Sequence, residues 1–78
     1  MDNFFSLACG KIGTPYKVVS IAASLRIKRR LLQLGFVDTT IILLQRSRSG
    51  GVYLVQIRDY VLSLKAQEAS HLMVTYAG

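Results

Sequence analysis

The residues able to ligate a metal ion are few and scattered: one histidine, one cysteine, three aspartates and one glutamate. Glu68 and His71 are three residues apart and could share a helical face, which would offer a carboxylate and an imidazole to a transition metal. Two ligands do not close a metal site, and the helix is expected to end between them. We therefore predict no metal site, with Glu68 and His71 as weak candidates. His71 is expected to open the last strand at the surface.

No group of residues indicates catalysis. The chain has no Ser/His/Asp arrangement, no paired acids and no phosphate-binding GxxxxGK[ST] loop. Gly50-Gly51 is too short to surround a phosphate and is typical of a hairpin tip. The sequence predicts a protein that is not an enzyme and has no cofactor.

The strongest chemical feature is positive charge. Ten lysines and arginines against four acids give a net charge of +6. Arg26, Lys28, Arg29 and Arg30 fall together in one predicted helix, where Arg26, Arg29 and Arg30 could face an acidic protein or phospholipid. A solvated helix face is the commoner meaning of such a cluster. Nucleic acid binding is the less favoured alternative, because single-strand binding needs aromatic rings interleaved with basic residues on the outside of the strands. The phenylalanines lie outside the central strands, and Tyr53 and Tyr60 fit the inward register.

The basic helix is predicted over Leu25–Leu34, with Ser24 as its N-cap. Ile27, Leu31 and Leu34 form one buried stripe. Gly35 can adopt the left-handed conformation that ends a helix, and Phe36 would then contact Leu31 as in a Schellman motif.

The remainder of the chain is predicted to form strands. A first strand over residues 16–22 precedes the helix, and further strands are expected at 40–47, 52–58, 60–65 and 71–76. Arg58-Asp59 predicts a tight reversal, because Asp tolerates positive φ. Residues 66–70 predict one helical turn. The fold class is therefore mainly β: a small, partly open barrel of about five strands, with a short helix inserted after the first strand.

Strand alternation predicts an apolar patch on the outside of this barrel. If Tyr53, Val55 and Ile57 point inward together with Tyr60, Leu62 and Leu64, then Val52 and Leu54 point outward. Ile42 points outward by the same argument. Either another element covers these side chains, for example the N-terminal residues 3–7, or Ile42, Val52 and Leu54 form an exposed patch for protein contact or self-association.

The chain shows no sign of export. Its single cysteine, Cys9, cannot form an internal disulfide, and Asp2 stands where a signal peptide would carry basic residues. No stretch approaches the roughly 18 apolar residues of a transmembrane helix. We expect one domain, residues 1–78, located in the cytoplasm.

An ordered set of residues resembles the ferrous iron transport protein A (FeoA) family over nearly the whole chain. The set comprises Arg30, Leu31, Leu34, Gly35, Thr40, Gly50, Gly51, Val55, Ile57, Tyr60, Leu62, Leu64, Lys65, Glu68 and Ala69. Departures from the family pattern lie in loops: Asp38-Thr39 replaces Pro-Gly, Arg48 and Val52 replace prolines, and Asp59 replaces a turn glycine.

The resemblance implies an SH3-like barrel that acts as a cytoplasmic, non-catalytic partner of the ferrous iron transporter FeoB. It would contact the cytoplasmic portion of FeoB, regulate Fe²⁺ uptake, and lie at the membrane only through this partner. Arg26, Arg29, Arg30, Ile42, Val52 and Leu54 are the predicted partner-binding residues. The same module also forms the C-terminal domain of metal-dependent repressors. Two alternatives remain. The protein could be a small basic barrel that binds nucleic acid, or a metal sensor that uses Glu68 and His71.

Overall fold

The computed structural model describes residues 3–47 and 51–77. Its elements, in chain order, are β1 (Phe5–Ser6), the 3-10 helix η1 (Leu7–Cys9), β2 (Pro15–Ile21), α1 (Leu25–Gln33), β3 (Thr40–Arg46), β4 (Val52–Ile57), β5 (Tyr60–Lys65), α2 (Ala66–Ala69) and β6 (Leu72–Tyr76). Gly50 of the predicted hairpin tip lies outside the described residues.

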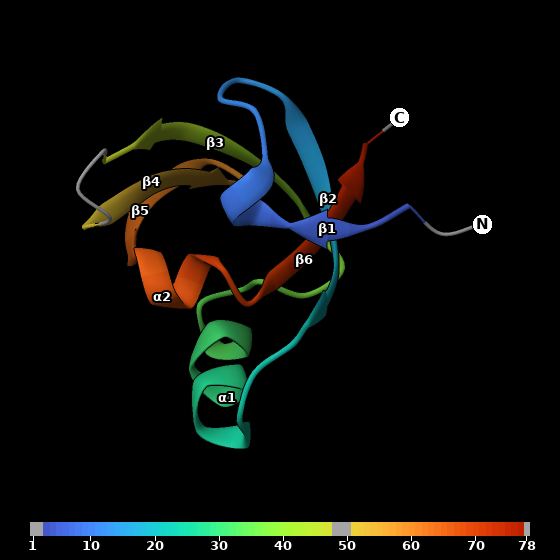
Figure 1. The fold of residues 1–78 in the computed structure, drawn as a ribbon, viewed down its shortest axis with the longest axis vertical. Helices are drawn as coiled ribbons and strands as arrows, with labels where there is room; N and C mark the ends of the chain where they lie inside the picture. The colour runs from blue at the N-terminus through green and yellow to red at the C-terminus, as the bar shows by residue number, and fades with distance from the viewer. Residues whose placement is uncertain (1–2, 48–50, 78) are drawn as a thin grey trace.

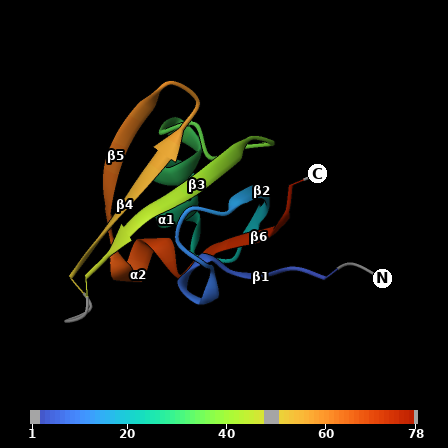
Figure 2. The same ribbon diagram turned by 90° about the horizontal axis from the view of Figure 1, so that it is seen from above.

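The strands form one antiparallel sheet in the order β1-β6-β2-β3-β4-β5. The sheet curls on itself, and α1 projects from one end (Figure 1; Figure 2). The two edge strands, β1 and β5, are not paired with each other, so the barrel is partly open. This confirms the predicted fold class, with α1 following the first of the long strands.

The prediction of about five strands missed β1, a two-residue strand that pairs with β6. Phe5 lies opposite Val74, so the pairing joins the two ends of the chain. Such a short segment has no readable alternation, and only the distant partner strand makes it a strand. Beyond β1, Leu7 is completely buried.

The end of α1 has the predicted Schellman geometry. Gly35 has a φ of 103°, and its N–H donates to the Leu32 carbonyl at 3.0 Å. The Phe36 N–H donates to the Leu31 carbonyl at 3.1 Å. These two bonds satisfy carbonyls that the helix end would otherwise leave unpaired. At the other end, Ser24 is the N-cap, although its side chain makes no capping hydrogen bond.

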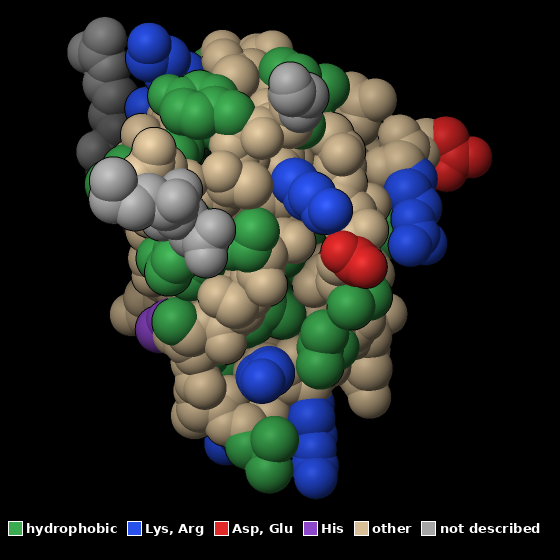
Figure 3. Space-filling model, turned by 90° about the vertical axis from the view of Figure 1, so that its right-hand side faces the viewer, with side chains coloured by type: hydrophobic (Ala, Val, Ile, Leu, Met, Phe, Trp, Pro, Cys, Tyr) green, Lys and Arg blue, Asp and Glu red, His purple; other side chains and the backbone are tan. Residues whose placement is uncertain are grey.

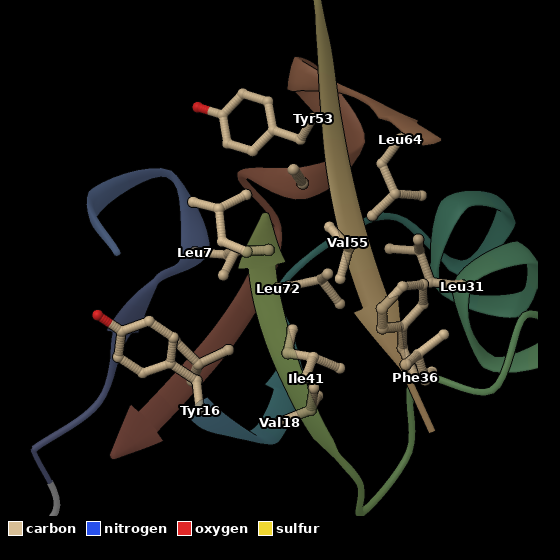
Figure 4. Packing of buried hydrophobic residues seen from close by; sticks show 14 of the residues in the cluster. Leu7, Tyr16, Val18, Leu31, Phe36, Ile41, Tyr53, Val55, Leu64 and Leu72 are labelled. Carbon is tan, nitrogen blue, oxygen red and sulfur yellow. The ribbon is translucent and has the colours of Figure 1, made fainter. Parts of the chain in front are cut away.

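Leu31 and Phe36 enter the core from α1 and the loop that follows it. Both side chains are completely buried, and they lie beside Val55 and Leu64 of the sheet (Figure 4). The rest of the buried cluster comprises Leu7, Tyr16, Val18, Ile21, Ile41, Leu43, Tyr53, Ile57, Ala69, Leu72 and Val74. Leu31 thus joins the helix to the inner face of the barrel.

Two details of the β4–β5 hairpin differ from the prediction. Tyr60 is 41% exposed, because its hydroxyl donates to the Leu34 carbonyl at 2.6 Å and so holds the ring at the sheet edge. In the turn, the non-glycine residue with positive φ is Arg58, at 57°, and not Asp59. Asp38, which stands in a loop before β3, also has a positive φ, of 50°.

An ion pair joins α1 to α2. Arg30 Nε lies 3.0 Å from Glu68 Oε2. The other carboxylate oxygen, Oε1, accepts a hydrogen bond from the Lys65 backbone N–H at 3.2 Å, which caps α2. Both oxygens of Glu68 therefore have structural partners.

The substitution Gly35→Ala is expected to lower the free energy of unfolding by about 1–3 kcal/mol, because an L residue is strained at this φ. The added Cβ would also lie 3.2 Å from Tyr60 Oη and 3.4 Å from Ile57 Cδ1. Gly13→Ala is the matched control, because Gly13 has a φ of 85° but no atom within 4 Å of an added Cβ. Urea denaturation of both variants measures the loss of unfolding free energy. If Gly35→Ala loses no more than Gly13→Ala, the contact of the added Cβ with Tyr60 and Ile57 is unimportant.

A double-mutant cycle of Arg30→Gln and Glu68→Gln is expected to give a coupling energy below about 1 kcal/mol but above zero. Arg30 is 65% exposed, so solvent screens much of the attraction. Glutamine at position 68 can still accept the capping hydrogen bond, so the cycle isolates the charge interaction. Arg29→Gln combined with Glu68→Gln should be additive, and equal coupling at both arginines would contradict a specific Arg30–Glu68 pair.

Candidate functional site

The outer side of β3 and β4 presents a surface that we call the hairpin face: Ile42, Gln45, Val52, Leu54 and Gln56. Ile42 lies opposite Gln56, and Gln45 lies opposite Leu54. Val52 is 46% exposed, whereas Ile42 and Leu54 are half-buried. The hairpin face therefore carries apolar and amide side chains and no charge.

Alternation along β4 explains this surface. Tyr53, Val55 and Ile57 are buried, so the residues between them must face away from the core. A shallow hollow of about 390 Å³, lined by Gln45, Ser47, Val52 and Leu54, lies here. A mixed apolar and polar surface of this kind is typical of a protein contact.

The N-terminal segment does not lie over this face. β1 pairs with β6, and β2 and β3 intervene between β6 and β4 in the sheet. Phe5 instead packs edge-to-face on Tyr16, with ring centroids 5.4 Å apart, and also against Tyr76. The alternative in which residues 3–7 cover Ile42, Val52 and Leu54 is therefore wrong.

The three predicted arginines lie on a different surface. Arg26 and Arg29 are exposed on α1, while Arg30 is paired with Glu68. Because Leu31 packs onto the inner side of the sheet, α1 and the hairpin face lie on opposite sides of β4 (Figure 1; Figure 4). The structure thus divides the six predicted partner-binding residues into two surfaces.

Several exposed apolar residues near α1 escaped sequence reasoning. Leu25 and Leu32 on the helix are 63% and 38% exposed, and Val19 and Val37 nearby are 47% and 51% exposed. In Figure 3, hydrophobic and Lys or Arg side chains are interleaved over the end of the molecule that α1 forms. The seven-residue spacing of Leu25 and Leu32 was a readable signal, because it places them on one helical face away from Leu31.

Glu68 and His71 each have partners within the protein. Glu68 is engaged by Arg30 and the Lys65 N–H, while His71 Nδ1 lies 2.9 Å from the Ala22 carbonyl. His71 precedes β6, which begins one residue later than predicted. Within residues 3–47 and 51–77, no three His, Cys, Asp or Glu side chains gather where they could hold a metal ion.

No helix in the described part of the chain is both long and apolar enough to span a bilayer.

Known structures share this fold. A FeoA-like protein from Clostridium acetobutylicum is 26% identical, with a TM-score of 0.85 over 97% of this chain and 90% of that one. A zinc complex of FeoA from Stenotrophomonas maltophilia, described as an SH3 domain protein, is 28% identical, with a TM-score of 0.78 over 91% and 89% of the two chains.

A manganese-dependent transcriptional repressor has a TM-score of 0.88 but is only 20% identical. The match covers 99% of this chain but only 44% of the repressor. At this level of identity, the likeness shows the fold alone. No curated protein matches the chain.

The FeoA domain model matches residues 5–76, almost the full length of the chain. FeoA proteins are small accessory domains implicated in ferrous iron transport, and they are not a known enzyme family. The fold, the SH3-like relatives and this match lead to one conclusion: the chain belongs to the FeoA family.

Proposed function

We propose that this protein is a cytoplasmic, non-catalytic accessory protein that binds the cytoplasmic portion of the transporter FeoB and thereby regulates Fe²⁺ uptake. Family membership supports the iron-uptake role. The proposed contact with FeoB rests on the hairpin face. There, Val52 and Leu54 point away from the core, because the alternate residues of β4 are buried. Cover by the N-terminal segment was one of two alternatives for this surface, and that segment pairs with β6 instead.

The uncharged hairpin face is suited to a contact that excludes water. Burying apolar surface stabilises a complex, and the amides of Gln45 and Gln56 can form hydrogen bonds at its margin. The face is small, so the complex is expected to be transient. An accessory protein of this kind regulates transport only if it binds one state of the transporter more tightly than another.

Nucleic acid binding receives less support from the same surface. Binding of single strands on a small barrel requires basic residues and exposed aromatic rings on the strands. The hairpin face has neither: Tyr53 is buried, and the basic residues of α1 lie on the other side of the sheet.

The substitutions Val52→Glu and Leu54→Glu are each expected to weaken binding to the cytoplasmic domain of FeoB by about tenfold or more. A carboxylate at the centre of an apolar contact must lose its hydration without gaining a partner. Calorimetry or a pull-down with the purified domain and with the full transporter in detergent measures the effect. RNA serves as a parallel bait.

Ile12→Glu is the matched control, because Ile12 is 53% exposed and lies outside the hairpin face. It should bind as the unchanged protein does, and circular dichroism should show that all three variants are folded. Equal weakening by Ile12→Glu would argue against a specific surface. Capture of RNA in a salt-sensitive manner, without binding to the purified domain or to the full transporter, would overturn the proposed function.

A further inference from the structure

The outward side of α1 combines exposed leucines with basic residues. Leu25, Lys28, Arg29 and Leu32 are spaced by three and four residues, so they share one face of α1. This face is turned away from the stripe of Ile27, Leu31 and Leu34 that packs on the core. Leu25 is 63% exposed and Leu32 is 38% exposed. Arg26 adjoins this group. No core requirement explains leucine at these two positions.

Apolar exposure continues from the helix onto β2. A groove of about 240 Å³ runs between α1 and β2, and Val19, Lys28, Leu32 and Val37 are among the residues that line it. Val19 stands at an irregularity in the pairing of β2 with β6, which turns its side chain outward. We call Leu25, Arg26, Lys28, Arg29 and Leu32, together with Val19 and Val37, the helix face.

Among the residues that the structure describes, no acid is paired with Arg26, Lys28 or Arg29 of the helix face. Asp38 lines the groove, but it pairs with Lys17 at 3.8 Å, and Glu68 pairs with Arg30 at 3.0 Å. Arg26, Lys28 and Arg29 therefore remain as excess cations. All three lie on the helix that projects from one end of the molecule.

Anionic lipid fits this chemistry better than the other polyanions. Phosphate headgroups can bind the basic side chains while leucines enter the boundary of the acyl chains. Nucleic acid would use the cations but gain little from Leu25 and Leu32. We propose that the helix face binds the surface of a bilayer containing anionic phospholipid.

The projecting shape of this end agrees with contact to a flat surface. α1 lies at one end of the long axis of the molecule (Figure 1). The hairpin face lies on the outer side of β4, because the alternate residues of that strand are buried on the inner side, where Leu31 packs. Binding through the helix face therefore leaves the hairpin face free. This inference stands apart from the proposed function, because vesicles of pure lipid test it without FeoB.

The first experiment measures co-sedimentation of the full chain with vesicles of phosphatidylcholine alone or of phosphatidylcholine mixed with phosphatidylglycerol. Binding is expected only to the anionic vesicles and should fall as salt is raised. Inorganic phosphate at millimolar concentration should not displace the protein. Displacement by phosphate, or no binding to anionic vesicles alongside capture of RNA, would overturn the proposal.

Matched variants identify the surface. Arg26→Gln/Arg29→Gln should lower the partition coefficient by at least about tenfold, since each basic residue near an anionic surface contributes roughly fivefold. Lys11→Gln/Lys65→Gln removes the same charge from exposed positions elsewhere and should have a much smaller effect. Leu25→Gln should also weaken binding, whereas Val61→Thr, at a 54% exposed site on β5, should not. Equal loss in both charge variants would contradict a localised site.

A fluorescence readout tests insertion directly, because the chain contains no tryptophan. The Leu25→Trp variant should show a blue shift of its emission with anionic vesicles, and the Val61→Trp variant should show none. An unshifted Leu25→Trp spectrum at saturating anionic lipid would refute contact by the helix face, even if the protein sediments. Both variants are at exposed positions, and circular dichroism checks that they fold.

Discussion

The packing of Leu31 and Phe36 against the inner side of the sheet is the interaction on which the rest of the structure depends. Both side chains are completely buried, and the Schellman motif at Gly35 links them through the hydrogen bond from the Phe36 N–H to the Leu31 carbonyl. Because this contact defines the inside of β4, it also defines the outside, where Val52 and Leu54 lie. The same contact turns Leu25 and Arg29 of α1 toward solvent. One packing arrangement thus generates both candidate surfaces.

The features that the sequence predicted correctly are those with a local cause. Gly35-Phe36 ends α1 as expected, because the motif involves only neighbouring backbone groups. The inward register of Tyr53, Val55 and Ile57 follows from strict alternation within one strand. The register also indicated the apolar outer face of the β3–β4 hairpin, whereas the fold class followed from the five predicted strands and the inserted helix.

The features that were missed depend on contacts between distant segments. β1 exists because β6 provides its partner, and Arg46 anchors the N-terminal segment by donating to the Ala8 and Gly10 carbonyls at 3.0 and 2.9 Å. Tyr60 is held outward by a carbonyl of α1. The division of the predicted partner-binding set into two surfaces was invisible for the same reason. Only the three-dimensional packing shows that Arg26 and Val52 lie on opposite sides of the sheet.

The fold by itself does not decide function, since a manganese-dependent repressor shares it at 20% identity. We propose two functional surfaces: an uncharged hairpin face for a protein and a basic, apolar helix face for lipid. Their opposed positions would allow α1 to rest on the membrane while the hairpin face contacts the cytoplasmic part of the transporter. This arrangement combines the two proposals and requires no metal or catalytic residue.

The most direct test of the hairpin face as the protein-binding surface is chemical-shift mapping of the labelled protein during titration with the unlabelled cytoplasmic domain of FeoB. We expect the perturbed amides to cluster on β3 and β4 around Ile42, Val52 and Leu54, while those of Arg26 and Arg29 remain unchanged. Perturbations confined to α1, or spread along the β1–β6 edge, would contradict the assignment of the hairpin face as the surface that binds the transporter.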